Sequence, residues 1–339
     1  MKVAISGLNN TDNPAPGIPV IKSLKDKNEI VGFSYDPNEP GNYMQMCKKT
    51  YLMPYPSLGF EELENRLRYI QENEGLEGII PNLDAELPLY IKYQEQIESM
   101  GIKLCLPSLE NFELRNKNKL TQLSQQLNIT YPQTYEISSE KELEDIMDKK
   151  ELNFPIMVKG NYYKAYKSHN KESAVENFHK ISSEWGFPIL IQEVVEGEEL
   201  NLVGVGDGEG VLSGAVGIKK LTTTEIGKIW TGITIQNEKL IKIAQDFVAL
   251  TKWKGPFELE CMVNMNKVYL IEINPRFPAW VYFATEIGVN LPQMVVDIMQ
   301  NKKVKPILTY PQNKMYVRYT GEFVCDFGNF MKLLSTKEL

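Results

Sequence analysis

The first residues that suggest chemistry are Glu260 and Glu272, because each lies within an apolar-rich run typical of a β-strand. The runs Phe257–Val263 and Val268–Ile273 flank a short polar segment, which is the pattern of two antiparallel strands joined by a turn. A turn centred on Asn266 places Glu260 opposite Glu272, with Cβ atoms roughly 4.5–5.5 Å apart. Two like charges at that separation repel, and a divalent cation such as Mg²⁺ makes the arrangement favourable.

Asn274 and Arg276 extend this pattern beyond the second strand. Asn274 follows Glu272 by two positions, so a strand places both side chains on one face. The planar guanidinium of Arg276 suits a phosphate or a carboxylate. Carboxylate, amide oxygen and arginine together indicate metal-bound phosphate. A surface hairpin with a solvated acidic face explains the same spacing without any ligand.

The run Leu270–Arg276, Leu-Ile-Glu-Ile-Asn-Pro-Arg, resembles the metal-binding signature of the ATP-grasp superfamily, which includes biotin carboxylase, carbamoyl phosphate synthetase and D-alanine ligase. Glu260, twelve residues before Glu272, also stands where that signature has its first acid. The resemblance implies that Glu260, Glu272 and Asn274 hold Mg²⁺ or Mn²⁺. It further implies that Arg276 contacts the transferred phosphoryl group or the intermediate.

The same resemblance implies lysines on the phosphates of ATP. Lys159 ends the strand-like run Phe154–Gly160 and stands where the family has the lysine that reaches the α- and β-phosphates. Lys117 stands where many members have their first phosphate-contacting lysine, and Lys119 is its near rival. A solvated helix lysine is the alternative interpretation of Lys117.

The stretch Pro188–Asn201 resembles the adenine hinge of the family. The resemblance implies that Glu193 accepts from the adenine amino group and that Val194 and Val195 bond through their backbone. It implies that Glu199 binds the ribose hydroxyls. An apolar slot with a few fixed polar groups is how a neutral purine is recognised.

Two further segments are expected near the terminal phosphates. Asn161–Asn170 occupies the place of the family's glycine-rich loop, of which only Gly160 remains. The family often has a basic residue after the hinge that faces the γ-phosphate or the acyl phosphate. Lys219 and Lys220 are both candidates and Lys228 follows them, and we take Lys220 as the catalytic one.

Strand-like and helix-like runs alternate in the first part of the chain, which predicts parallel βαβ units. The expected strands are Lys2–Ser6, Ile30–Tyr35, Gly78–Pro81 and Lys103–Leu106, and the expected helices include Leu87–Met100 and, beyond them, Glu110–Leu127. Polar residues after these strands, Asp84 and Glu86 among them, hint at a polar substrate pocket.

The predicted fold is therefore mixed α/β and α+β. A Rossmann-like pre-ATP-grasp domain is expected at residues 1–108, and the first part of an ATP-grasp fold with its small lid subdomain at 109–190. The second part, with the adenine hinge and the metal site, is expected at 191–339.

Composition limits the classes of function. A net charge of −7 gives no electrostatic reason to expect nucleic acid or an acidic membrane surface as a partner. The four cysteines form no CxxC pair, so reduced thiols are expected. No signal peptide and no apolar stretch of roughly 18 residues is recognisable, which favours the cytoplasm.

These features predict an ATP-dependent carboxylate–amine ligase that uses ATP and Mg²⁺ and releases ADP and phosphate. The expected partners are small-molecule or peptide carboxylate and amine substrates, with a homodimer as the oligomer considered. Two alternatives stay open, namely a bicarbonate-activating enzyme like biotin carboxylase and a non-catalytic nucleotide-binding or regulatory protein.

Overall fold

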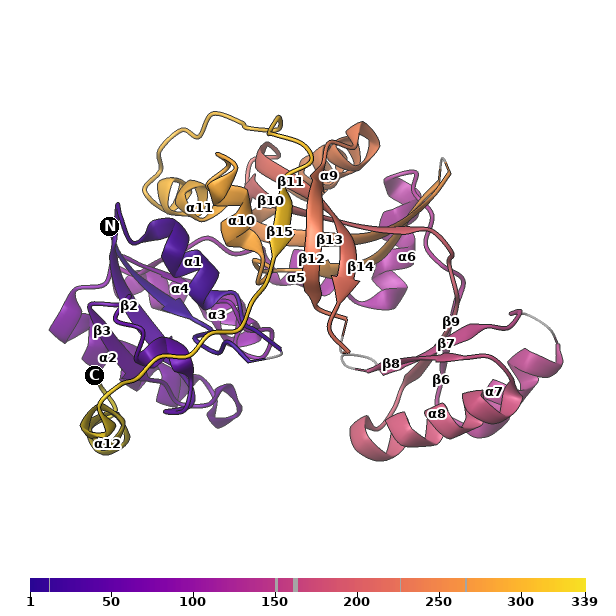
Figure 1. The fold of residues 1–339 in the computed structure, drawn as a ribbon, viewed down its shortest axis with the longest axis horizontal. Helices are drawn as coiled ribbons and strands as arrows, with labels where there is room; N and C mark the ends of the chain where they lie inside the picture. The colour runs from indigo at the N-terminus through magenta and orange to yellow at the C-terminus, as the bar shows by residue number, and fades with distance from the viewer. Residues whose placement is uncertain (12, 150–151, 161–163, 226, 266) are drawn as a thin grey trace. The chain divides into compact units, whose positions relative to one another are not determined.

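The structure, a computed structural model, describes residues 1–11, 13–149, 152–160, 164–225, 227–265 and 267–339 (Figure 1). The side chains of Lys117 and Asn118 lie outside this description. The chain divides into two compact units. Unit 1 comprises Met1–Leu123, Leu200–Glu260 and Glu272–Leu339, and unit 2 comprises Ser124–Glu199 and Cys261–Ile271. The three-domain division predicted from the sequence is finer than these units and stays a prediction.

The N-terminal part of unit 1 is built on a parallel sheet of five strands in the order β3-β2-β1-β4-β5. Its strands are β1 (Lys2–Ser6), β2 (Glu29–Ser34), β3 (Lys49–Leu52), β4 (Gly78–Ile80) and β5 (Lys103–Leu104). The helices between and after them are α1 (Gly17–Leu24), α2 (Phe60–Glu74), α3 (Leu87–Lys92), α4 (Gln94–Ser99) and α5 (Leu109–Glu113), with short 3₁₀ turns at Pro40–Asn42 and Pro56–Leu58.

Both faces of this sheet are covered, which explains why its strands are apolar throughout rather than alternating. Ala4 and Val31 belong to a core that also holds Leu67 of α2 and Tyr90 of α3. Val3, on the opposite face from Ala4, belongs to a second core shared with α1 and with the larger sheet of unit 1. This shared core joins the N-terminal sheet and the larger sheet within one unit.

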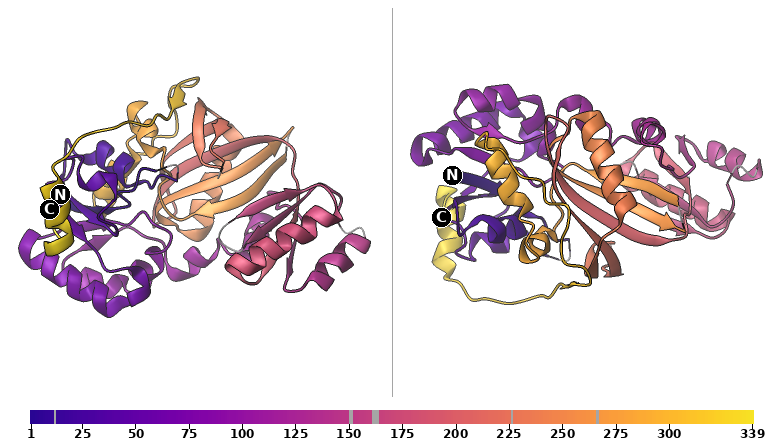
Figure 2. Two further views of the ribbon diagram at one scale, coloured as in Figure 1. Left: turned by 60° about the horizontal axis from the view of Figure 1, so that its bottom comes forward. Right: turned by 90° about the horizontal axis from the view of Figure 1, so that it is seen from above.

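The larger sheet has six strands in the order β14-β13-β10-β11-β12-β15. Its strands are β10 (Glu198–Asp207), β11 (Leu212–Thr223), β12 (Ile229–Ile235), β13 (Lys254–Asn264), β14 (Lys267–Asn274) and β15 (Met315–Val317). The pairs from β10 to β15 are antiparallel. Two helices, α9 (Glu238–Thr251) and α11 (Leu291–Met299), contact β11, and Figure 2 shows α9 lying against the strands. The short helix α10 (Val281–Glu286) precedes α11.

Unit 2 contains a smaller antiparallel sheet in the order β6-β9-β7-β8. Its elements are β6 (Thr134–Ile137), α7 (Glu140–Asp148), β7 (Ile156–Gly160), β8 (Ala165–Ser168), α8 (Lys171–Trp185) and β9 (Ile189–Glu193), and α6 (Lys117–Gln126) leads into the unit. Ile156 and Val158 of β7 pack with Leu143 of α7 and Phe178 of α8. Met157 and Lys159, which alternate with them along β7, are directed to the other face.

The expected mixed α/β architecture is confirmed, with three local corrections. The strand β3 was not predicted, because a four-residue edge strand carries little periodic signal. The expected helix Leu87–Met100 breaks at Tyr93, whose ring stacks on Phe60 at 3.9 Å between centroids. The expected helix Glu110–Leu127 is divided into α5 and α6. In the expected loop Asn161–Asn170, residues 161–163 lie outside the described chain.

The C-terminal segment carries elements that the sequence did not predict, β15 and the helix α12 (Phe327–Thr336). After α12 the last residues run beside β3. The backbone N–H of Thr50 donates to the carbonyl of Leu339 at 2.8 Å, and the N–H of Leu339 donates back to Thr50 at 2.9 Å. Leu52 N–H donates to the carbonyl of Lys337 at 2.9 Å. Residues 337–339, the C-terminal tail, therefore cover the edge of the parallel sheet.

Candidate functional site

Strand β13 directs two acidic side chains to the same face of the larger sheet, since Glu258 and Glu260 are separated by one residue. Leu259 between them is 1% exposed and belongs to the core. Asn274, the last residue of β14, donates through Nδ2 to Glu258 Oε2 at 3.1 Å and to Glu260 Oε1 at 2.9 Å. One amide group therefore holds two carboxylates together.

Glu258 is the most buried member of this cluster, with 4% of its surface exposed. Its Oε1 accepts from Asn201 Nδ2 and from Trp280 Nε1, both at 2.9 Å. Burial, followed by repulsion from Glu260, raises the pKa of Glu258 above its ordinary value. Glu258 was not among the residues predicted from the sequence, although the alternation Glu-Leu-Glu in a strand indicates two acids on one face.

Cations balance the second carboxylate. Lys220 of β11 is nearly enclosed, with 8% of its side chain exposed, and its Nζ lies 3.5 Å from Glu260 Oε2. Burial acts to raise the pKa of Glu260, but Lys220 and then Lys228 outweigh that effect, and the pKa lies below its ordinary value. Glu260 is thus held as a carboxylate. Of the three lysines considered from the sequence, Lys220 makes the direct ion pair described here.

Arg276 lies two residues beyond β14 and pairs with Asp84, which follows β4 of the parallel sheet. Asp84 Oδ2 accepts from Arg276 Nε at 2.9 Å and lies 2.9 Å from its Nη2. A second arginine, Arg115, places Nη1 at 3.5 Å from Asp84 Oδ1. Burial opposes the charge on Asp84, but Arg276 and Arg115 hold the pKa of this carboxyl below its ordinary value.

The predicted metal ligands are only partly brought together. Glu260 and Asn274 are in contact, whereas Glu272 is exposed. Burial acts to lower the pKa of Arg276, but Asp84, then Glu258 and finally Glu272 raise it above its ordinary value. Within the described residues no three His, Cys, Asp or Glu side chains form a group that could hold a metal ion.

The oxygen donors present still fit a hard cation such as Mg²⁺, because carboxylates and amide oxygens are the ligands it takes. The fit rests on Glu258 and Glu260, two carboxylates that share the Nδ2 of Asn274. A half-turn of the Asn274 amide would present its Oδ1 to a cation beside them. The ligand set Glu260, Glu272 and Asn274 stays a prediction, to which the structure adds Glu258 as a neighbour.

The residues expected to bind the nucleotide lie largely in unit 2. Lys159 of β7 donates through Nζ to Gln192 Oε1 at 2.6 Å, and Gln192 in turn donates to Thr134 Oγ1 at 2.7 Å. Three neighbouring strands therefore fix the lysine on the face of the sheet opposite the core. Glu193 ends β9, and its carboxylate accepts from the backbone N–H of Gln133 at 2.9 Å.

The remaining nucleotide candidates are less constrained. Val194 and Val195 are half-buried in the segment after β9, and Glu199 is half-buried in β10. Lys117 is the first residue of α6, but its side chain lies outside the described part of the chain. Its rival Lys119 forms an ion pair with Glu113.

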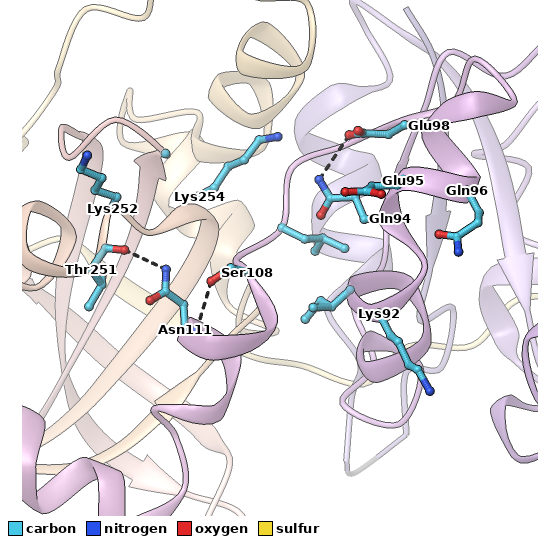
Figure 3. Close-up of a pocket in the computed structure, with 13 residues that line it drawn as sticks. Lys92, Gln94, Glu95, Gln96, Glu98, Ser108, Asn111, Thr251, Lys252 and Lys254 are labelled. Atoms are coloured by element: carbon cyan, nitrogen blue, oxygen red, sulfur yellow. Dashed lines mark hydrogen bonds between the residues drawn. The ribbon is translucent and has the colours of Figure 1, made fainter.

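A separate polar depression of ≈ 740 Å³ lies elsewhere in unit 1 and includes none of the predicted site residues (Figure 3). One side comes from the end of α9 and the start of β13, with Lys252 and Lys254, and the other from α4, with Gln94 and Glu98. Asn111 donates to the carbonyl of Thr251 at 2.8 Å beneath it.

No helix within the described residues has the length and apolar character that crossing a membrane requires.

Part of the chain matches a known protein family. Residues 187–323 match the family described as ATP-grasp in the biosynthetic pathway with Ter operon.

Among sequence relatives, the carbamoyl phosphate synthase large chain of Clostridium acetobutylicum is 24% identical over 266 residues, which is 74% of this chain and 24% of that protein. The chain therefore spans about a quarter of the length of that relative. Among solved structures, L-amino acid ligase from Bacillus licheniformis superposes with a TM-score of 0.66 at 16% identity, covering 90% of this chain and 77% of the ligase.

A further solved structure is the biotin carboxylase domain dimer of the Hydrogenobacter thermophilus 2-oxoglutarate carboxylase, in complex with MgADP, ADP and bicarbonate. It superposes with a TM-score of 0.70 at 16% identity, covering 93% of this chain and 73% of the other. The family match, the sequence relatives and the shared fold agree with the signature at Leu270–Arg276. Together they support the assignment of this chain to the ATP-grasp superfamily.

Proposed function

We propose that this protein is an ATP-dependent carboxylate–amine ligase that forms an amide or peptide bond. The observation that carries the proposal is the enclosed cluster of Glu258, Glu260 and Asn274, balanced by Lys220 at 3.5 Å from Glu260. Paired carboxylates with adjacent cations suit the binding of a metal-associated phosphate chain. The L-amino acid ligase that shares the fold supports the assignment to this reaction class.

The proposed reaction has two steps. A carboxylate oxygen of the first substrate attacks the γ-phosphorus of ATP, the bond from that phosphorus to the ADP oxygen breaks, and an acyl phosphate forms. The amine nitrogen of the second substrate then attacks the carbonyl carbon, and the bond to the phosphate oxygen breaks. The nitrogen loses a proton, and ADP and phosphate are released.

Each predicted residue has a role in this scheme. Mg²⁺, when bound by Glu260, Glu272 and Asn274, supplies positive charge that stabilises the transferred phosphoryl group. Lys220 and Arg276 add charge on the protein side, because both are nearly enclosed and their charges are weakly screened there.

The nucleotide itself is assigned to the residues before and within unit 2. Lys117 and Lys159 contact its phosphates in this proposal, and Glu193, Val194, Val195 and Glu199 hold adenosine. The N-terminal parallel sheet serves as the Rossmann-like pre-ATP-grasp domain, and the small sheet of unit 2 serves as the lid. Small-molecule or peptide carboxylates and amines are the substrates, and the cytoplasm is the expected location.

The second candidate function is activation of bicarbonate, as in biotin carboxylase. It is favoured by the likeness to the biotin carboxylase domain bound to MgADP and bicarbonate, which is itself a dimer. A homodimer is part of our proposal on the same ground. A non-catalytic nucleotide-binding role is the third candidate.

Product analysis distinguishes these functions. The protein is incubated with ATP, Mg²⁺ and a mixture of amino acids, short peptides and small carboxylic acids, and nucleotides are separated by chromatography. We expect acid-stimulated ADP and phosphate, with slow turnover when no acid is present, and hydroxylamine should trap the acyl phosphate as a hydroxamate. Acid-stimulated AMP would overturn the mechanism, and ADP formation that depends only on bicarbonate would favour the carboxylase. Nucleotide binding without any turnover would indicate the non-catalytic role.

A further inference from the structure

We infer that Asp84 is a positioning residue for this reaction, which holds the guanidinium of Arg276 so that its outer edge meets the substrate carboxylate. The inference rests on the proposed function, because it assigns a task within the carboxylate-activating step. Asp84 comes from the turn after β4, in a part of the chain that the signature around Arg276 does not include.

The contacts of Arg276 show which edge Asp84 occupies. Asp84 Oδ2 accepts a hydrogen bond from Arg276 Nε at 2.9 Å and lies 2.9 Å from Nη2. The carboxylate of Asp84 therefore binds the side of the guanidinium that includes Nε. The carbonyl of Phe277 accepts from Nη1 at 3.2 Å. A guanidinium carries five N–H groups, and the two described hydrogen bonds use Nε–H and one N–H of Nη1, so N–H groups on Nη1 and Nη2 are left for a ligand among the described contacts. Two parallel N–H groups are the fork that binds a carboxylate bidentately.

The surroundings keep this arrangement rigid. Arg276 has 12% of its side chain exposed, and Asp84 has 30%. Arg115 contacts the second oxygen of Asp84 and lies 4.1 Å over the ring of Phe112, which anchors it in turn. Asp84 is therefore held between two arginines. An arginine that is already oriented loses less conformational entropy when its ligand arrives.

The experiment compares Asp84→Asn with wild type, using Asp26→Asn as the matched control, because Asp26 is exposed in the same unit and the charge change is equal. The probe is an equimolar mixture of the proteinogenic amino acids, and ADP release is followed at saturating ATP and Mg²⁺. We expect Asp84→Asn to raise the half-saturating concentration of the mixture about tenfold or more, with a much smaller change in maximal turnover. Affinity for MgADP by calorimetry should stay unchanged.

Two further variants separate positioning from a structural link. Asp84→Glu keeps the charge and should recover part of the lost affinity for the acids. In an Arg276→Lys background, Asp84→Asn should have little additional effect, since the residue acts through the arginine. A readout that does not depend on activity is exchange of the Arg276 Nε–H in ¹⁵N NMR spectra, which should be slow in wild type and Asp26→Asn and fast in Asp84→Asn.

The outcomes are distinct. If wild type responds to the acids and Asp84→Asn keeps the wild-type half-saturating concentration, the inference is wrong while the proposed function stands. A lower melting temperature with unchanged kinetics would mean that Asp84 only links the two parts of unit 1. If wild type shows no acid-stimulated ADP release, the proposed function and the inference fall together. A fast-exchanging Nε–H in wild type would overturn the geometry itself.

Discussion

Replacing Lys220 by methionine should destabilise the protein, because it removes a buried charge and leaves the carboxylate of Glu260 without its direct ion-pair partner. The side chain of Lys220 is 8% exposed and that of Glu260 22% exposed, and 3.5 Å separates Nζ from Oε2. At an effective dielectric constant of about 20, unit charges at that distance interact by about 5 kcal/mol.

The expected loss is smaller than this interaction. Lys228 and Arg276 still act on Glu260 in the variant, and the partial exposure of Glu260 screens the remaining charge. Removing one partner of a buried ion pair usually costs about 3–5 kcal/mol. We therefore expect Lys220→Met to lose about 3 kcal/mol of unfolding free energy.

Urea unfolding at pH 7.5 measures this loss, with Lys303→Met as the control, since Lys303 is exposed on the surface. The double variant Lys220→Met/Glu258→Gln should recover part of the stability, because it removes the other carboxylate of the cluster. Added MgCl₂ should stabilise Lys220→Met more than wild type. A free energy of unfolding within about 0.5 kcal/mol of wild type, with an unchanged denaturant slope, would refute the reasoning.

Glu272→Gln should abolish metal-dependent turnover and leave the fold intact, because Glu272 is exposed; wild-type turnover across a Mg²⁺ titration would contradict its role as a ligand. Lys159→Ala should weaken ATP binding by roughly 1.5–3 kcal/mol, the contribution of a charge-assisted contact, whereas Lys119→Ala should change it little; equal affinities by calorimetry would remove Lys159 from the site. Burial raises the pKa of Glu39 from 4.5 to about 7, so the folded protein keeps a proton that the unfolded chain has lost. The stability contributed by Glu39 is complete below pH 4.5 and is lost as the pH rises to about 7, by at most about 3 kcal/mol. Glu39→Gln should abolish this difference between unfolding at pH 5 and pH 8, and an unaltered pH dependence would show that other groups cause it.

The elements predicted well were those with a strong periodic signal and clear turn residues. The apolar run Lys2–Ser6 is a strand with the predicted bounds. The run Asp-Gly-Glu-Gly that begins at Asp207 forms a turn, with Asp207 Oδ1 accepting from the N–H groups of Glu209 and Val211. In these cases the local sequence alone determines the conformation.

The elements missed depend on contacts that are distant in sequence. The ring of Tyr93 stacks on Phe60, and this packing accompanies the break between α3 and α4. The helix α12 contributes one fully buried side chain, Leu333, so its apolar residues carry no clear core pattern.

The candidate site was predicted in composition more than in arrangement. The resemblance named Glu260, Glu272, Asn274 and Arg276, and of these the structure shows Glu260 and Asn274 in contact. It did not indicate that Glu258 would share Asn274, or that Asp84 would bind Arg276 from 192 positions away along the chain. Spacing within one hairpin specifies neighbours on that hairpin, whereas ion pairs between distant segments emerge only from tertiary packing.

The C-terminal tail beside β3 has a practical consequence for handling the protein. Without residues 337–339, the N–H groups of Thr50 and Leu52 would lose their carbonyl partners, and β3 would present a bare sheet edge. Such an edge is a template for pairing between molecules, which leads to aggregation. Shortened versions of this chain that end before Lys337 should therefore precipitate more readily, and bulky additions beside the tail should disturb its pairing with the sheet.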